Sequence, residues 1–252
     1  MSVAKIQLVE VKKAFKFKET EQVVFDTFSL SIGKGEFVAI LGPSGCGKTT
    51  LLNLIAGFLS PDSGQVLVEG NQVTSPNSSR AMIFQDDAVF PWLTVTQNIE
   101  YGLKLNGKQP SERNQIVQRI LDDFGLNEER NKYPAYLSGG QLKRVDIARA
   151  LANSPEVMLM DEPFGSLDNF TRERLLHYVS DALLSRRTTN LLVAHDIEEA
   201  LWLSDRIIVL TPRPAGIKLD MPVLFPRPRS SKLKFTSEFQ NQRKRLIEEL
   251  AS

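Results

Sequence analysis

The chain reads Phe37-Val-Ala-Ile-Leu-Gly-Pro-Ser-Gly-Cys-Gly-Lys-Thr-Thr50 across one strand-to-helix junction. Five apolar residues in a row are typical of a strand buried on both faces, and Leu51, Ile55 and Phe58 follow at helical spacing. The residues between them fit the pattern G-x-x-x-x-G-K-[ST], in which backbone N–H groups converge on phosphate oxygens at the positive end of a helix. This strand, loop and helix predict an α/β nucleotide-binding unit.

The phosphate loop supplies most of the predicted nucleotide contacts. We expect Lys48 to place a point charge on the β- and γ-phosphates and the Thr49 hydroxyl to ligate Mg²⁺. The predicted ATP-contacting residues of the loop are Gly42, Pro43, Ser44, Gly45, Cys46, Gly47, Lys48, Thr49 and Thr50. A position beside a helix N-terminus favours the thiolate of Cys46. Maleimide alkylation is therefore expected to abolish hydrolysis, with protection by bound ATP, and a buried inert thiol is the alternative.

Two carboxylates end a second buried strand, Val157-Met-Leu-Met-Asp161-Glu162. In a parallel sheet, groups at this edge lie beside the phosphate loop. Asp161 is therefore expected to hold Mg²⁺ through water, and Glu162 to act as general base toward the attacking water.

A second anion-binding motif, Leu137-Ser-Gly-Gly-Gln141, opens a predicted helix. Ser138 is a suitable N-cap, and the two glycines leave backbone N–H groups open at the positive end of the helix dipole. One chain cannot easily bring this site and the phosphate loop onto one γ-phosphate. The two motifs therefore suggest a nucleotide held between two copies of the chain.

The remaining pattern is a strand-rich core with one helical insertion, and no repeat or low-complexity tract is visible. Predicted strands cover Ile6–Val11, Val23–Ile32, Gln65–Glu69, Arg80–Phe84, Val157–Met160, Asn190–Ala194 and Ile207–Leu210. A polar turn is expected over Lys12–Glu21, and Ile207–Leu210 is the last clear strand. Predicted helices cover Ser111–Phe124, Gln141–Asn153 and about Phe170 to Arg186.

The expected fold class is α/β: a P-loop NTPase core, with a mixed sheet that has an antiparallel β part, and an inserted helical subdomain. We expect one nucleotide-binding domain over residues 1–252. Its core would comprise 1–85 and 155–211, its helical subdomain 86–154, and its basic C-terminal extension 212–252.

Composition narrows the function classes. Hydrophobic residues at 42% and charged residues at 24% of 252 residues exclude a disordered or collagen-like chain. Lys and Arg number 31 against 30 Asp and Glu, so no net field favours nucleic acid as a partner. One cysteine fits a reducing compartment, and no apolar run approaches the roughly 20 residues of a spanning helix. We therefore expect a soluble protein of cytosolic type.

The last 40 residues carry an excess of positive charge. From Arg213 onward there are nine Lys and Arg against four Asp and Glu. A solvated basic tail is one interpretation, and contact with anionic lipid or a membrane partner is the other.

Over nearly its whole length the chain resembles the ATP-binding subunits of ABC transporters, because LSGGQ and the phosphate loop occur together and in this order. The resemblance implies that Gln85 senses Mg²⁺ and γ-phosphate and faces the membrane subunits, and that His195 contacts γ-phosphate. It further implies that Ser166-Leu-Asp168 crosses a dimer interface. Phe15 is the best match for the aromatic residue that stacks on adenine, with Phe17 as the alternative.

The complete set of site residues follows from the motifs and this resemblance. The catalytic residues would be Glu162, His195 and Gln85, and the Mg²⁺ ligands Thr49, Gln85 and Asp161. Ser138, Gly139, Gly140 and Gln141 would contact ATP from the second copy. The chain departs from the family pattern at Leu142-Lys143, where polar or basic residues are commoner, and at Asp146, where a small residue is usual.

The resemblance also implies an activity and partners: an ATP-hydrolysing, energy-coupling subunit of an importer. It would act as a homodimer with two transmembrane permease subunits and an extracytoplasmic substrate-binding protein, at the cytoplasmic face of the inner membrane. Phe90 and Trp92 are expected to contact the membrane subunits, or alternatively to pack the insertion's own core. An ATPase of DNA repair or translation is a different class, but only 53 residues separate Gln85 from Ser138, too few for the long coiled coil of repair relatives.

Five stretches resemble the nitrate, sulfonate and taurine branch of importers. They are Leu51–Phe58, Phe90–Ile99, Pro163–Arg172, His195–Ala200 and Pro212–Pro214. The resemblance implies uptake of a small anion, with a sulfonate such as taurine ahead of nitrate. Polyamine, sugar and phosphate importers remain alternatives, because their ATPases share the same catalytic motifs.

Overall fold

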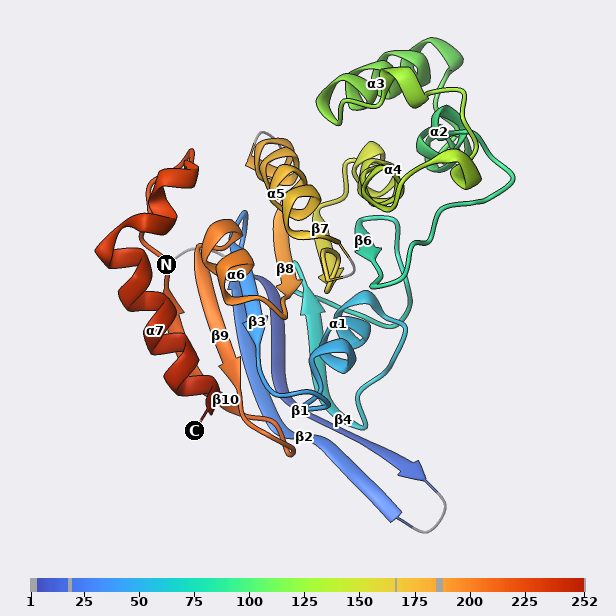
Figure 1. Ribbon diagram of the computed structural model, residues 1–252. Coiled ribbons are helices and arrows are strands. Elements are labelled where there is room, and N and C mark those ends of the chain that lie inside the picture. The colour runs from blue at the N-terminus through green and yellow to red at the C-terminus, as the bar shows by residue number, and fades with distance from the viewer. Residues whose placement is uncertain (1–3, 18–19, 166, 185–187, 252) are drawn as a thin grey trace.

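The computed structural model describes residues 4–17, 20–165, 167–184 and 188–251. Its centre is a six-stranded sheet in the order β10-β9-β3-β8-β7-β6 (Figure 1). The strands are β10 (Ile217–Pro222), β9 (Arg206–Leu210), β3 (Phe37–Leu41), β8 (Thr189–Val193), β7 (Val157–Asp161) and β6 (Arg80–Ile83). All are parallel except β10, which runs antiparallel to β9. The carboxyl ends of five strands therefore meet at one edge.

All five residues of β3 are buried, as the apolar run predicts, because both faces of the strand are covered. Successive side chains point to opposite faces of a sheet. Phe37, Ala39 and Leu41 accordingly join the core beneath the helical layer, whereas Val38 and Ile40 join a second core on the other face. This strand therefore connects the two apolar cores.

A second sheet, in the order β2-β1-β4-β5, covers the second core. It contains β1 (Ala4–Phe17), β2 (Thr20–Gly33), β4 (Ser63–Val68) and β5 (Asn71–Gln72). Helix α1 (Lys48–Ala56) buries Leu51, Leu52, Leu54 and Ile55 in the same core, which also receives side chains from β1 and β8. The helix that follows the phosphate loop is thus packed between elements of two sheets.

The predicted polar turn over Lys12–Glu21 is wrong for Lys12–Phe17 and Thr20–Glu21, which are strand, while residues 18–19 lie outside the described residues. The β1–β2 ladder continues through this segment, pairing Lys13 with Phe25 and Phe17 with Thr20. The hairpin extends beyond the rest of the molecule (Figure 1), so its charged side chains can stay in water while the backbone pairs. In Lys12–Phe17 and Thr20–Glu21, the charged side chains therefore marked solvent-exposed strand and not a turn.

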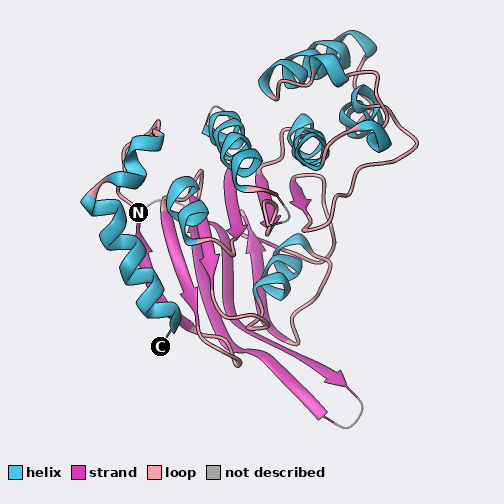
Figure 2. Ribbon diagram, viewed as in Figure 1, coloured by secondary structure: helices cyan, strands magenta, loops and turns pink. Residues whose placement is uncertain are grey.

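The inserted helices form a layer at the end of the molecule away from this hairpin (Figure 2). They are α2 (Val95–Leu105), α3 (Pro110–Asp123) and α4 (Gly139–Ala152), with short 3₁₀ turns η1 (Asn127–Glu129) and η2 (Pro134–Tyr136). A capping box starts α2, in which Thr94 and Gln97 satisfy each other's backbone N–H groups. Helices α5 (Asn169–Leu184) and α6 (Ile197–Leu203) return the chain to the sheet.

The C-terminal segment is folded against the core, which corrects two expectations. Ile207–Leu210 is followed by the further strand β10, then by η3 (Ser231–Phe235) and α7 (Ser237–Ala251). Arg229, only 7% exposed, donates to the carbonyls of Leu201 (3.0 Å) and Trp202 (2.6 Å), and Arg227 donates to that of Leu203. These carbonyls end α6, where the helix dipole favours cations. The two arginines therefore cap a helix, and neither interpretation as a solvated tail or a lipid contact holds for them.

No helix in the described part of the chain has the length and apolar character needed to span a membrane.

Candidate ATP-binding and hydrolysis site

The phosphate loop joins the carboxyl end of β3 to α1 and depends on its glycines. Gly45 and Gly47 have φ of +76° and +123°, values that L side chains rarely adopt. A Cβ on Gly47 would lie 2.5 Å from Cγ1 of Val24 in β2, so the loop is packed against the hairpin. The Lys48 ammonium folds over the loop and donates to the carbonyls of Gly42 (3.0 Å) and Pro43 (3.3 Å). Two carbonyls of the loop thus hold the lysine charge over it.

The expectation of a reactive Cys46 thiolate is wrong. Cys46 is 1% exposed and its side chain belongs to the core between the sheets. Burial raises the pKa of the thiol, against smaller opposing effects of Lys48 and Arg213. The Cys46 backbone N–H donates to the Pro43 carbonyl of the loop (3.2 Å).

Two carboxylates meet the loop at the same sheet edge. Asp161 ends β7, is buried, and lies close enough to the Thr49 side chain for that hydroxyl to lower its pKa. Burial raises the pKa of Asp161, and the Thr49 contact and the Lys48 charge oppose that shift. A hydroxyl and a carboxylate beside an ammonium are oxygen donors of the kind that Mg²⁺ takes in phosphate sites.

Glu162 follows directly and adopts a left-handed backbone conformation, with φ of +45°. Such a conformation costs a non-glycine residue about 1–2 kcal/mol. It is held by a hydrogen bond from the Glu162 N–H to the Val193 carbonyl of β8 (2.9 Å). The backbone therefore turns sharply between the two carboxylates, and Glu162 remains partly exposed at the edge.

Gln85 and His195 lie just beyond the carboxyl ends of β6 and β8, and both are exposed. The Ala194 N–H bonds the Ile40 carbonyl (3.1 Å), which fixes the segment before His195 against β3. Asp196 then caps α6 by accepting from the N–H of Glu198 (2.6 Å). The fold thus gathers Thr49, Asp161, Glu162, Gln85 and His195 at one sheet edge.

Sequence reasoning missed Arg172, which lies behind this edge. Its guanidinium donates to the carbonyls of Leu167 (2.9 Å) and Phe164 (3.3 Å), and its Nε lies 3.3 Å from a carboxylate oxygen of Glu199. Burial raises the pKa of Glu199 to about 7. Arg172 thereby links the segment after Glu162 to the helix after His195. The only sequence feature that could have indicated this residue was its place within Pro163–Arg172, one of the stretches that resemble the importer branch.

The predicted interface loop is described in part. Asp168 caps α5 by accepting from the N–H groups of Phe170 (3.1 Å) and Thr171 (3.0 Å), while Ser166 lies outside the described residues. The cap fixes the end of the loop next to α5.

Ser138 caps α4 as predicted, with a reciprocal bond between its backbone N–H and the Gln141 side chain. Gly140 lies against α5, since a Cβ there would lie 2.2 Å from Thr171, whereas a Cβ on Gly139 would meet no atom of the described residues within 4 Å. Helix α4 belongs to the helical layer and α1 lies between the sheets, in separate parts of the molecule (Figure 1). Within one chain, the fold does not bring the two anion-binding motifs together.

Phe15 is exposed on the hairpin that borders the phosphate loop. It pairs with Gln22, two residues from the Val24 that contacts Gly47, and the Lys13 ammonium lies 5.5 Å from its ring centroid. The side chain of Phe17 lies outside the described residues, so the choice between the two aromatics stays open.

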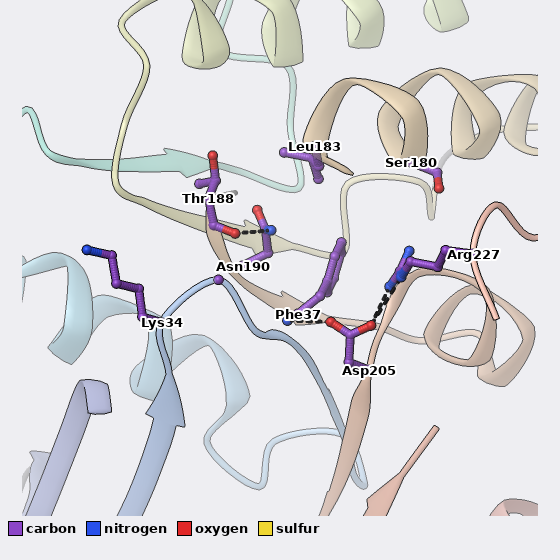
Figure 3. Close-up of a pocket in the computed structure, with 9 residues that line it drawn as sticks. Lys34, Phe37, Ser180, Leu183, Thr188, Asn190, Asp205 and Arg227 are labelled. Atoms are coloured by element: carbon purple, nitrogen blue, oxygen red, sulfur yellow. Dashed lines mark hydrogen bonds and ion pairs between the residues drawn. The ribbon is translucent and has the colours of Figure 1, made fainter. Parts of the chain in front are cut away.

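A separate cavity of about 480 Å³ lies at the opposite edge of the sheet (Figure 3). Asp205 accepts there from the Phe37 N–H (3.0 Å) and from Arg227 (2.9 Å), and Asn190 donates to the Thr188 carbonyl (2.8 Å). These groups pair with one another at the amino ends of β3, β8 and β9. The phosphate loop lies at the carboxyl ends of the same sheet, so this cavity is distinct from the phosphate-loop edge.

Comparison with known proteins identifies the family. Residues 25–165 match the ABC transporter family profile. The nitrate import ATP-binding protein NrtD of Synechocystis is 41% identical over 240 residues, which is 93% of this chain and 90% of that protein. The taurine import ATP-binding protein TauB of Jannaschia is 46% identical over 189 residues, which is 75% of this chain and 70% of that protein.

Solved structures agree with this likeness. The dimeric ABC transporter cassette MJ0796 has a TM-score of 0.77 at 31% identity, over 88% of this chain and all of that one. The post-hydrolysis dimer of the same cassette, bound to ADP and Pi, has a TM-score of 0.76 at 30% identity with the same coverage. The chain belongs to the ABC transporter family, as one of its ATP-binding, ATP-hydrolysing subunits.

Proposed function

We propose that two copies of the chain hydrolyse MgATP head to tail, with each nucleotide held between the phosphate loop of one copy and Ser138–Gln141 of the other. The observation that carries this proposal is the contact between Thr49 and Asp161 at the phosphate-loop edge, together with a second capped helix end on α4 in another part of the chain. The dimeric form of the related cassette, including its state with ADP and Pi, supports the arrangement.

The proposed chemistry assigns one task to each group at the edge. The loop amides and Lys48 bind the β- and γ-phosphates, and Phe15 stacks on adenine. Glu162 accepts a proton from a water molecule while the oxygen of that water attacks the γ-phosphorus. The bond from that phosphorus to the β–γ bridging oxygen breaks. His195 and Gln85 donate to γ-phosphate oxygens in the transition state.

Bound Mg²⁺ would supply positive charge at the β- and γ-phosphate oxygens. The Thr49 hydroxyl, Asp161 through water and the Gln85 amide would hold it, since all are the oxygen donors that this ion prefers.

The proposed docking site for the permease pair is an exposed aromatic surface that borders β6. A groove of about 390 Å³ there is lined by Phe90, Tyr101, Leu105 and Arg149, among others. Trp92 is 68% exposed at 5.5 Å from the Phe90 ring. Phe90 itself packs on Tyr101 and Arg149 and so serves the insertion's core as well. We expect this surface of each copy to receive a helix of one permease subunit at the cytoplasmic face of the membrane. An extracytoplasmic protein would deliver the substrate.

The proposed cargo is a small anion, with a sulfonate such as taurine ahead of nitrate. This part rests on the likeness to proteins named for taurine and nitrate import. Deletion of the gene should impair growth on taurine or an alkanesulfonate as sole sulfur source, or on nitrate as sole nitrogen source. Unchanged uptake of all three would refute the cargo and leave the ATPase assignment intact.

Two variants test the hydrolytic mechanism. Glu162→Gln keeps the shape of the side chain but removes the base, so it should bind ATP, release no phosphate, and elute as a nucleotide-stabilised dimer in size-exclusion chromatography. Lys48→Ala should lose phosphate release because the charge on the β- and γ-phosphates is gone. Phosphate release at the unmodified rate by either variant would refute these roles.

A further inference from the structure

Two of the positions at which the chain departs from its family pattern form a buried ionic cluster. Lys143 and Asp146 of α4 are 1% and 2% exposed, one turn apart. Asp146 bonds Arg149 through Oδ1 (2.9 Å), while its Oδ2 lies 4.0 Å from Lys143 Nζ. Burial raises the pKa of Asp146, and the charge of Arg149 opposes that shift most.

The Lys143 ammonium is directed at the segment that carries Gln85. It lies 3.1 Å from the carbonyl oxygen of Gln85 and 3.4 Å from that of Phe84. It also forms an ion pair of 2.9 Å with Asp87. One buried cation on α4 therefore holds three acceptors from four consecutive residues, and one of these acceptors belongs to Gln85 itself.

A second cation of α4 holds the same segment farther along. Arg149 donates to the Ala88 carbonyl and stacks on the Phe90 ring with its guanidinium carbon 5.0 Å from the centroid. From α2, the Asn98 side chain accepts from the Phe90 N–H (2.8 Å) and donates to the Phe90 carbonyl (3.1 Å). The segment from Phe84 to Phe90 is thus fixed to the helical layer at both of its ends.

Stability alone is a weak reason for such a cluster. Taking two charges out of water is costly, and apolar side chains of similar volume often replace a buried ion pair without loss of stability. What an apolar pair cannot do is hold backbone carbonyls in one orientation, because it offers no donor. The ammonium of Lys143 therefore specifies the path of the backbone at Gln85.

We propose that Lys143 is a positioning residue, which sets Gln85 according to the position of α4 and so couples the two nucleotide sites of the dimer. The inference rests on the proposed head-to-tail dimer. In that dimer, Ser138–Gln141 at the start of α4 contacts the nucleotide bound by the partner, while Lys143, farther along the same helix, holds Gln85 of its own site. Occupancy of one site is thereby transmitted along α4 to the metal-sensing residue of the other.

Lys143→Met tests the proposal, because methionine keeps the apolar stem and removes the ammonium. The full chain should bind a fluorescent ATP analogue at the phosphate loop within about twofold of the unmodified affinity. Its kcat should fall between about tenfold and a hundredfold, the scale on which misplacement of a positioned group lowers a rate. The Mg²⁺ concentration for half-maximal activity should rise, and the Hill coefficient for ATP should fall toward one.

Three further variants separate positioning from folding. Lys104→Met removes an exposed lysine of α2 that pairs with Glu100 and should leave all parameters unchanged. Lys143→Arg should restore part of the Mg²⁺ response, since it keeps a donor. Lys143→Met combined with Asp87→Asn removes the carboxylate charge that has lost its 2.9 Å ammonium partner, so it should recover the melting temperature and not the Hill coefficient.

The outcomes distinguish failure of the positioning role of Lys143 from failure of the proposed function. If Lys143→Met matches Lys104→Met in kcat, Mg²⁺ response and Hill coefficient, the positioning role is refuted while the ATPase assignment stands. Recovery of all three parameters together with the melting temperature in the double variant refutes it as well. If the unmodified chain hydrolyses no ATP and Glu162→Gln forms no nucleotide-dependent dimer, it is the proposed function that fails.

Discussion

Replacement of Gly47 by alanine should destabilise the protein through two separable effects. The first is backbone strain, because Gly47 has φ of +123° and ψ of 11°, and a residue with a Cβ in such a region costs about 1–3 kcal/mol. The second is overpacking, because the new Cβ would lie 2.5 Å from Val24 Cγ1 and 3.2 Å from the Phe25 ring, which costs about 1–3 kcal/mol more. The expected loss is therefore about 2–6 kcal/mol of unfolding free energy, a large share of an ordinary total of about 5–15 kcal/mol.

Urea unfolding followed by circular dichroism measures this loss, and two further variants divide it. Gly70→Ala is the control for strain, since Gly70 has φ of +75° and a new Cβ there would meet none of the described residues within 4 Å; about 1–2 kcal/mol is expected. Val24→Ala removes the clashing methyl groups, so the double variant with Gly47→Ala should show a favourable coupling of about 1–3 kcal/mol.

The reasoning would be refuted if Gly47→Ala unfolded at the unmodified urea concentration, or if the coupling with Val24→Ala stayed below about 0.5 kcal/mol, which is the scatter of additive pairs. In either case the loop would tolerate a Cβ by moving away from β2. The rigid contact between loop and hairpin would then not describe the protein in solution.

Three further predictions follow from burial and exposure. Cys46 should react with maleimide far more slowly in the native protein than in urea, since the thiol is buried; equal rates, followed by liquid chromatography and mass spectrometry, would contradict this placement. Trp92→Ala should keep the melting temperature and the ATPase rate of the isolated subunit and lose uptake in the assembled transporter. Phe90→Ala should lose uptake and also lower the melting temperature. If Trp92→Ala retains uptake, Trp92 does not belong to the docking site. Burial raises the pKa of Glu199 from 4.5 to about 7, so this carboxyl binds more protons in the folded state than in the unfolded state. Its contribution to stability is therefore full below pH 4.5 and is lost, by about 3 kcal/mol, as the pH rises through 7. Glu199→Gln should flatten that decline in pH-dependent urea unfolding, and an unchanged slope would show that Glu199 does not titrate there.

The elements that sequence reasoning placed well are those whose signal is local. The strand and helix around the phosphate loop follow from one apolar run and one glycine pattern, and the Ser138 cap follows from a residue type three positions before Gln141. These features need only neighbours along the chain. Local chemistry was therefore sufficient to predict them.

The elements that were missed depend on partners distant in sequence. Arg229 looked like a free charge until its acceptors were seen to be carbonyls 27 and 28 residues away. Cys46 looked reactive because its position beside a helix end is local, whereas its burial depends on a core assembled from residues far apart in sequence. Lys143 likewise meets acceptors 58 and 59 residues away, which no periodicity reveals.

The arginines that cap α6 also bear on the order in which the protein is completed. A ribosome adds about 5–20 residues per second, so roughly two to seven seconds separate the synthesis of His195 from that of Arg229. During this interval the carbonyls of Leu201 and Trp202 lack the guanidinium that later binds them. Vectorial synthesis therefore supplies every residue of the phosphate loop before the segment that caps the end of α6, the helix that follows His195.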